Sequence, residues 1–286
     1  MQPGERRGVE LAVLAVVCFS FGAVLTIWAD PLSPYEKTAG RLAIGSMAVL
    51  TISLAQRRAP HYSRPDAPRF LWFGLVAAVH FLCFMGSLSY TTIAHALTLT
   101  YTSPVFVTLF SAVFLKEPMA RRQYVSIGAV ILGIAILVGF QPQLDSRMLA
   151  GDGMALMAAI AGGVYSVIGR SQRDRYPLLT YAFATYAVAG LWLLPAAWLT
   201  FDPTHYGARQ LLALLALGVL PLAVGHTLYN AAVRHTHATY VNVIATQEIT
   251  GGMLLGLVLL GQLPTPNSVL GAGITLAGIA LVLFSG

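Results

Sequence analysis

Charged residues are scarce in this chain. Of its 286 residues, 10% are Asp, Glu, Lys or Arg, whereas 57% are hydrophobic. Soluble domains carry about 25% charged residues. The composition therefore excludes an ordinary soluble protein and predicts a protein that crosses a membrane many times.

Cysteine is nearly absent as well. Both cysteines, Cys18 and Cys83, lie inside apolar segments. Two such residues do not form a disulfide framework, and no Cys/His spacing typical of a metal site occurs. We therefore expect neither a bound metal nor another cofactor.

The sequence also lacks the usual motifs of enzymes and of ATP-driven pumps. It contains no Gly-x-Ser-x-Gly and no Gly-rich loop that ends in Lys-Ser or Lys-Thr. The first motif would present a nucleophilic serine, and the second would hold the phosphates of ATP. Asp152 lies between two glycines, but at a predicted helix start, where Asp is a favourable cap. We expect no catalytic residues, and therefore no enzyme.

What the chain does contain is a series of apolar stretches of about 20 residues, long enough for a helix to cross a bilayer. Pro and Gly mark most connections, and no connection is long enough for a soluble domain. Arg6 and Arg7 precede the first stretch as in a signal peptide, but the stretch exceeds the usual apolar core of about 7–15 residues. We therefore predict an all-α integral membrane protein with ten transmembrane helices. The predicted spans are 8–28, 35–55, 69–89, 93–115, 121–140, 151–170, 178–200, 208–230, 238–260 and 267–285.

Basic residues are distributed unevenly between the predicted loops. With a cytoplasmic N-terminus, thirteen of the 17 Lys and Arg residues fall on the cytoplasmic side, and only Lys37, Arg147 and Arg209 fall on the other. This asymmetry is typical of the positive-inside rule. It predicts that both the N- and the C-terminus are cytoplasmic. The asymmetry and attraction to anionic lipid also account for the net charge of +6, so no nucleic-acid partner is expected.

The second half of the chain resembles the first. Residues 128–135 align without a gap with residues 273–280, an offset of 145, and both glycines coincide. We predict two five-helix repeats, at 1–143 and 150–286. Because five is odd, the second repeat enters the membrane from the opposite side, an inverted arrangement common in transporters with a site at the repeat interface. A chance likeness between two glycine-rich helices is the alternative.

Glu248 is the only acidic residue predicted deep inside a span. A carboxylate at the centre of a bilayer costs at least about 2.5 kcal/mol, so such a residue is a functional candidate by default. The alternative is a protonated or hydrogen-bonded Glu that only fixes helix packing. At the offset of 145, Glu248 stands where the first repeat has Ser103, and Gln262 stands where it has Glu117.

Span 93–115 has a small, polar face. Tyr101 shares this face with Thr98 and Val105, whereas Val107 is expected to face lipid. Pro104 removes a backbone hydrogen bond and frees a carbonyl one turn earlier. Irregular backbone at membrane depth is tolerated only in protein or beside water. We therefore predict that this span lines a cavity.

Further candidates lie in other spans. His80 and Phe84 are one helical turn apart, although a buried His is as often a hydrogen-bonded packing residue. Tyr165 follows Gly162-Gly163, where a neighbouring helix can approach closely. Span 238–260 holds the most polar stretch within the predicted spans. The candidate substrate-binding residues are His80, Phe84, Thr98, Tyr101, Tyr165, Asn242, Thr246 and Glu248, of which Glu248 and His80 are also candidates for proton coupling.

Two other polar residues are interpreted as interface residues. Arg41 lies about six residues inside span 35–55, from where it could extend outward to the headgroups, so we expect it to have a structural role. Tyr229 lies at the predicted cytoplasmic end of span 208–230, where Tyr is common.

The chain resembles the drug/metabolite transporter superfamily, in its ten-helix EamA-type branch. The resemblance covers essentially the whole chain but rests on short motifs. They are Ser103-Pro104-Val105-Phe106, Leu115-Lys116-Glu117-Pro118, Gln123 with Gly128 and Gly133, and Arg41 in the second span. The resemblance implies export or exchange of small metabolites, often amino acids or their relatives, across the bacterial inner membrane. It also implies a central cavity between spans one, three, four, six, eight and nine. The second repeat departs from the motif at Glu248.

We therefore expect a monomeric secondary transporter that works by alternating access around this cavity, with a small molecule as substrate and lipid as surroundings. Glu248 would bind a cationic group of the solute or carry a proton in exchange. An uncoupled channel or facilitator is the alternative, although two unequal repeats fit an asymmetric pocket better than a ring of equivalent polar positions. A second, more remote alternative is an intramembrane enzyme.

Overall fold

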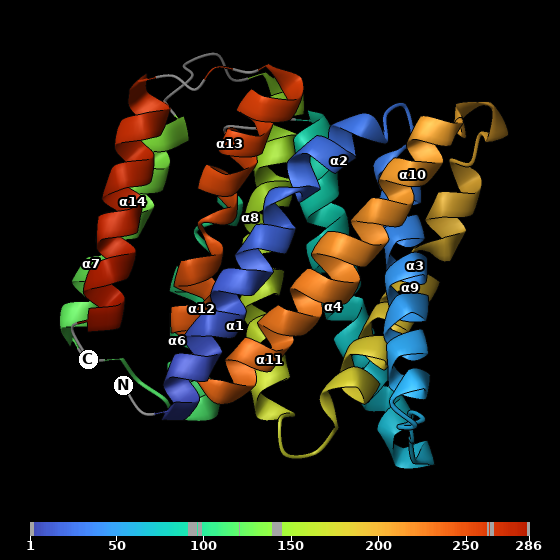
Figure 1. Ribbon diagram of the computed structural model, residues 1–286, viewed down its shortest axis with the longest axis horizontal. Coiled ribbons are helices and arrows are strands. Elements are labelled where there is room, and N and C mark those ends of the chain that lie inside the picture. Colours follow the sequence, from blue (N-terminus) through green and yellow to red (C-terminus); the bar gives the residue numbers. More distant parts are fainter. Residues whose placement is uncertain are drawn as a thin grey trace.

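The computed structural model describes residues 3–90, 96, 99–119, 121–138, 145–261, 263 and 266–284. These residues form a bundle of helices, with no strand among them (Figure 1). The α-helices are α1 (Pro3–Ser20), α2 (Gly22–Trp28), α3 (Pro34–Ala55), α4 (Ala67–Tyr90), α6 (Ser103–Phe110), α7 (Arg121–Val138), α8 (Ser146–Ser171), α9 (Leu178–Leu199), α10 (Ala208–Leu217), α11 (Thr227–His235), α12 (Ala238–Ala245), α13 (Glu248–Leu260) and α14 (Pro266–Phe284). Short segments of other helix types are η1 (Arg64–Asp66), η2 (Ser111–Leu115), η3 (Pro203–His205) and η4 (Gly218–His226).

Seven helical segments in the described part of the chain are long and apolar enough to cross a membrane. Three shorter apolar helices fall within the remaining predicted spans. The all-helical membrane fold is thus confirmed, whereas the number of ten spans stays a prediction. The seven are Gly4–Trp28, Pro34–Ala55, Arg64–Tyr90, Ser146–Ser171, Leu178–Leu199, Ala208–His235 and Ala238–Leu260, and the three are Ser103–Leu115, Tyr124–Ile136 and Val269–Gly278.

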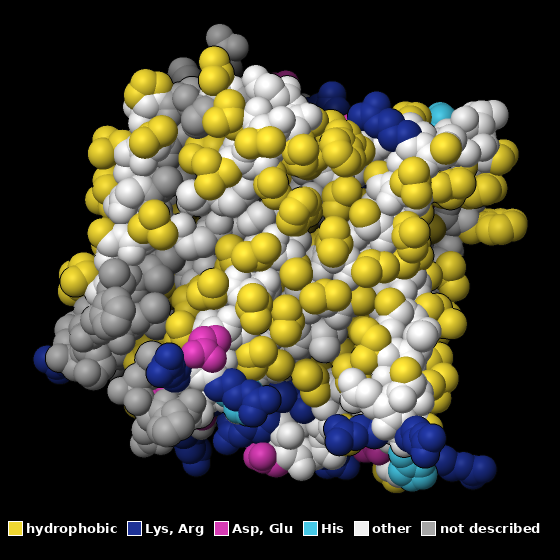
Figure 2. Space-filling view, in the orientation of Figure 1, with side chains coloured by type: hydrophobic (Ala, Val, Ile, Leu, Met, Phe, Trp, Pro, Cys, Tyr) yellow, Lys and Arg dark blue, Asp and Glu magenta, His cyan; other side chains and the backbone are white. Residues whose placement is uncertain are grey.

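The surface has the distribution of side chains that a bilayer requires. Hydrophobic side chains cover the sides of the bundle, and most of the visible Lys and Arg side chains gather at one end (Figure 2). Trp198 and Leu199, for example, are 80% and 85% exposed, and lipid provides an apolar environment for such side chains. Helix α1 begins and α14 ends at this same end of the bundle (Figure 1).

Two helical spans are interrupted halfway. A turn at Tyr101-Thr102 precedes α6, and a turn at Thr246-Gln247 separates α12 from α13. Pro104 is the second residue of α6. The N–H groups at a helix start have no acceptor within the helix, so the missing N–H of proline costs no hydrogen bond there. The irregular backbone predicted from Pro104 is therefore present, and the second break occurs 145 residues later without a proline.

Of the two glycine pairs that the halves share, Gly133 and Gly278 lie at the contact between α7 and α14. A Cβ on Gly133 would lie 2.5 Å from Thr275 Oγ1, and a Cβ on Gly278 would lie 2.8 Å from a methyl of Val130. The two helices lie side by side at the edge of the bundle (Figure 1). Small residues let helix backbones approach closely in lipid, so these glycines are explained by packing.

Candidate functional site

A cavity of about 90 Å³ lies inside the bundle. A water molecule needs about 10–15 Å³ by this measure, so the cavity holds a small solute or several waters. Its residues come from all six spans expected from the family resemblance, and from α3 in addition. They are Phe19, Gly22, Thr26, Arg41, His80, Phe81, Phe84, Met85, Thr100, Tyr101, Ser103, Gly162, Tyr165, Ser166, Pro221, His226, Tyr229, Asn242, Ala245 and Glu248.

Most of the predicted site residues line this cavity. Those that do are His80, Phe84, Tyr101, Tyr165, Asn242 and Glu248. Thr246 does not line it: its side chain is fully buried, and its hydroxyl donates to the carbonyl of Val243 at 2.7 Å. Thr98 lies outside the described residues.

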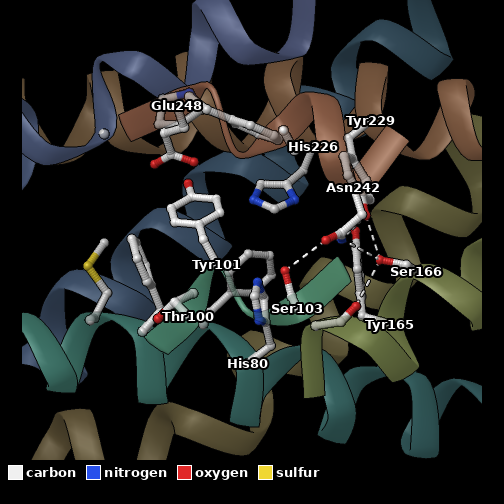
Figure 3. Close-up of a pocket in the computed structure, with 18 of the residues that line it drawn as sticks. His80, Thr100, Tyr101, Ser103, Tyr165, Ser166, His226, Tyr229, Asn242 and Glu248 are labelled. Carbon is white, nitrogen blue, oxygen red and sulfur yellow. Dashed lines mark hydrogen bonds between the residues drawn. The ribbon is translucent and has the colours of Figure 1, made fainter. Parts of the chain in front are cut away.

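Glu248 is the first residue of α13, immediately after the break in that span. Its carboxylate faces the hydroxyl of Tyr101, which comes from the other interrupted span (Figure 3). Gly22 lies beside the carboxylate: a Cβ there would be 3.6 Å from Glu248 Oε1, an ordinary contact distance. The start of a helix favours negative charge. Glu248 is the one carboxylate among the residues that line the cavity.

Arg41 is buried, and the interpretation of it as an interface residue is wrong. It is 4% exposed, and its guanidinium lies 5.0 Å from the centre of the Phe81 ring. Its Nε atom is buried without a hydrogen-bond acceptor. Helix α3 packs between α9 and η4, so Arg41 points into protein instead of toward the headgroups. The sequence did hold a signal for this buried position, namely a cation about six residues inside a predicted span.

A hydrogen-bonded network forms one side of the cavity. Ser103 donates to Asn242 Oδ1 at 2.7 Å, and Asn242 Nδ2 donates to the Tyr229 hydroxyl at 2.9 Å. Ser166 and Tyr229 share a further hydrogen bond (Figure 3). Tyr229 is therefore a cavity residue, and its predicted place at the interface is wrong. The helix continues to His235, five residues beyond the predicted end, which places Tyr229 deeper.

Two histidines face the cavity. His80 Nδ1 lies 2.8 Å from the carbonyl of Ala158, so that N–H donates to the backbone. Gly162 makes room for this ring, because a Cβ there would lie 2.9 Å from His80 Nδ1. His226 was not a candidate from the sequence. Its ring packs edge-on against Phe81 at 4.7 Å, and its Nδ1 is buried without a partner.

The predicted polar face of the fourth span is only partly correct. Tyr101 lines the cavity as expected, but Val105 is 43% exposed and Val107 is fully buried. The prediction assumed an unbroken helix. The turn at Tyr101-Thr102 changes the rotation of the following residues, so that α6 presents a different face.

A charged cluster lies where α8 and α11 end. Arg170 donates from two nitrogens to the Glu117 carboxylate, at 2.6 and 2.8 Å, and from a third to the carbonyls of Val233 and Thr236. His237 Nε2 lies 2.8 Å from the Glu117 carbonyl. Such paired bonds between Arg and a carboxylate are strong and geometrically specific. They tie the turn after η2 to α8 and to the connection before α12.

Known proteins that resemble this chain include two that are named as exporters. The chain is 31% identical to the pseudopaline exporter CntI of Pseudomonas aeruginosa (strain UCBPP-PA14), over 83% of this chain and 82% of that protein. It is 28% identical to a probable terminal-alkyne amino-acid exporter of Streptantibioticus cattleyicolor, over 63% and 60% of the two chains. A solved crystal structure matches with a TM-score of 0.83 over 96% of each chain, and at 19% identity this shows the fold alone.

The family match falls on each half of the chain separately. The EamA-like transporter family matches residues 6–139 and again residues 149–284. The two matches lie within a few residues of the repeats predicted from the sequence. A transporter, and not an enzyme, is what the family and the relatives' names indicate. With two matches that together cover nearly all of its residues, this chain belongs to the EamA-like transporter family.

Proposed function

We propose that this protein is a secondary transporter of the bacterial inner membrane that exports or exchanges small metabolites, with amino acids or related compounds as its substrates. The observation that carries the proposal is a buried cavity built from both halves of the chain, with one carboxylate on its surface. The two relatives named as exporters support the direction of transport.

The proposed mechanism is alternating access between two inverted five-helix repeats, residues 1–143 and 150–286. In support, α1 and α8 begin the two halves and run in opposite directions (Figure 1). Contacts between the halves are also reciprocal: α4 packs on α8, and α11 packs on α1. Rocking of one half against the other would open the cavity to each side in turn.

Glu248 is the proposed coupling residue. It either binds a cationic group of the solute or carries a proton in exchange, and His80 is the second candidate for the proton. Binding groups are proposed for Phe84, Tyr101, Tyr165 and Asn242, which line the cavity with them. Thr98 and Thr246 stay predictions from the sequence.

The proposed orientation places both termini in the cytoplasm. The end of the bundle that carries most of the visible basic side chains would then face the cytoplasm, as the positive-inside rule requires (Figure 2). With both halves on one chain, a monomer in lipid suffices for transport.

The test is efflux from liposomes that hold the purified protein and mixed amino acids and small metabolites. Wild type is compared with Glu248→Gln, with and without a pH gradient. Glu10→Gln is the matched control, because Glu10 forms an exposed pair with Arg6. We expect saturable efflux that Glu248→Gln abolishes and Glu10→Gln does not change.

Three outcomes decide between mechanisms. Acceleration by a pH gradient that depends on Glu248 would identify proton exchange. Normal efflux by Glu248→Gln with an unchanged pH profile would contradict the charged role of Glu248. Efflux that rises linearly with solute concentration would favour the alternative of a channel or facilitator, since a carrier must saturate.

A further inference from the structure

The cavity holds two charged side chains of opposite sign that do not pair with each other. Glu248 comes from the second half of the chain and Arg41 from the first, and both line the cavity. The ion pairs in the described part of the chain do not include these two residues. Buried charges are costly unless each has a partner. Each charge acts on the other through space, but neither has an ion-pair partner in contact. The arrangement therefore leaves room for a ligand that contacts both charges.

Arg41 has a hydrogen-bond donor without an acceptor. Its side chain is more than nine-tenths buried, and its Nε has no acceptor. Phe81 covers one face of the guanidinium, which leaves its edge as the polar surface. The Nε and one terminal nitrogen along that edge match the two oxygens of a carboxylate. His226, whose Nδ1 also lacks a partner, lines the same cavity.

Glu248 offers the complementary half of the site. The Tyr101 hydroxyl faces its carboxylate, and Gly22 lies beside it. No cationic side chain forms an ion pair with it in the part of the chain that the structure describes. An ammonium group carries three donors in a small volume, and it suits an acceptor beside a glycine.

We propose that the cavity binds a zwitterion, with its carboxylate on Arg41 and its ammonium group on Glu248. This inference rests on the proposed function, since it assumes that the cavity is the transporter's substrate site. The rest of the substrate packs against the aromatic and sulfur-containing side chains of Phe19, Phe84 and Met85. A zwitterion satisfies both protein charges at once. An amine leaves Arg41 unpaired, and a carboxylic acid leaves Glu248 unpaired.

The experiment compares three molecules of nearly equal shape: phenylalanine, phenethylamine and 3-phenylpropionate. A second set, alanine with ethylamine and propionate, covers a small substrate. Binding is measured by thermal stabilisation in detergent, because the neutral forms of the amine and of the acid cross lipid unaided. Wild type, Glu248→Gln, Arg41→Gln and the control Glu10→Gln are compared.

We expect wild type and Glu10→Gln to bind the amino acid of at least one set at least tenfold more tightly than its amine and its acid. Glu248→Gln should lose the preference over the acid, and Arg41→Gln should lose the preference over the amine. If Arg41→Gln does not fold, the wild-type comparison with the amine decides the role of the cation. Equal binding of the amine or of the acid by wild type, or no binding within either set, would overturn the proposal.

Failure of the proposed transport function and failure of the proposed zwitterion site give different results in these two experiments. If the amino acid binds with this pattern but wild type shows no efflux in liposomes, transport is wrong and zwitterion binding stands. If efflux is saturable but the amine or the acid binds as well as the amino acid, transport stands and the zwitterion site is wrong.

Discussion

The two interrupted spans follow the same backbone course with different side chains. The turn at Tyr101-Thr102 recurs at Thr246-Gln247, and each span ends in a left-handed residue, Lys116 at φ 55° and Gly261 at φ 68°. Every one of these positions is separated from its counterpart by 145 residues. A shared backbone with unequal side chains is what a duplicated chain would retain when only one copy carries the charge.

The side chains at the start of the second segments act differently. Ser103 is hydrogen-bonded to Asn242 in the other half of the chain. Its counterpart Glu248 faces Tyr101, also in the other half. Each span therefore reaches across to the other, but one contact is between neutral groups and the other presents a carboxylate. The backbone repeat builds the cavity, and its chemistry comes from the positions where the repeats differ.

The largest expected effect on transport comes from replacing Glu248 in the second half by serine, the residue at the equivalent position 103 of the first half. Glu248→Ser should reduce efflux by more than about a hundredfold, since removing one buried charge leaves its partner in the complex unpaired at a cost of about 3–5 kcal/mol. Efflux from liposomes, with protein content matched, measures it. Adding Ser103→Glu should not restore transport, because residue 103 faces Asn242 and not Tyr101. Recovery in the double variant would show that the two positions are equivalent.

A smaller effect is expected where the halves are equivalent, at the contact between α7 and α14. Gly133→Ala and Gly278→Ala should each lower stability by about 1–3 kcal/mol, because the added methyl meets the facing helix. Thermal unfolding in detergent measures both. Gly128→Ala is the control, since a Cβ there meets nothing within 4 Å. Similar losses in all three variants would mean that helix contact is not the cause.

The left-handed helix ends should respond in opposite directions. Gly261→Ala should cost about 1 kcal/mol, because a Cβ disfavours this backbone conformation by roughly 1–2 kcal/mol and nothing crowds the position. Lys116→Gly should raise stability by less than about 1 kcal/mol, since relief of the same strain is partly offset by the entropy of glycine. Unfolding midpoints of the two variants test this, and a change of the same sign in both would contradict it.

The smallest effect concerns pH at the connection before α12. Burial lowers the pKa of His237 from its usual 6.5. Its Nε2–H donates to the Glu117 carbonyl, and its Nδ1 accepts from Thr239 N–H, which requires the neutral ring. The unfolded chain therefore binds the proton more readily, so stability falls as the pH drops below about 6.5. Unfolding midpoints at pH 7.5 and 5.5 should differ more for wild type than for His237→Gln.

Several features were predictable from local sequence because lipid imposes simple rules. Apolar stretches of span length predicted the helices, and the scarcity of charge predicted the membrane. A buried Glu in an apolar stretch pointed to the cavity, and Gly162 beside Tyr165 pointed to a close helix contact. His226, Arg41 and Tyr229 were missed or misplaced, since the depth of a residue depends on where its helix ends and on which neighbours cover it.

The sequence by itself determined that the protein is an all-helical membrane protein, and an offset of 145 pointed to the two halves that the family matches separately. These features follow from composition, span length and internal likeness, which need no three-dimensional information. Only the tertiary structure decided that Arg41 turns inward, that α6 starts on a new face, and that residues from seven spans meet at one cavity. Helix breaks and contacts between distant helices set those outcomes, and no local pattern of residues specifies them.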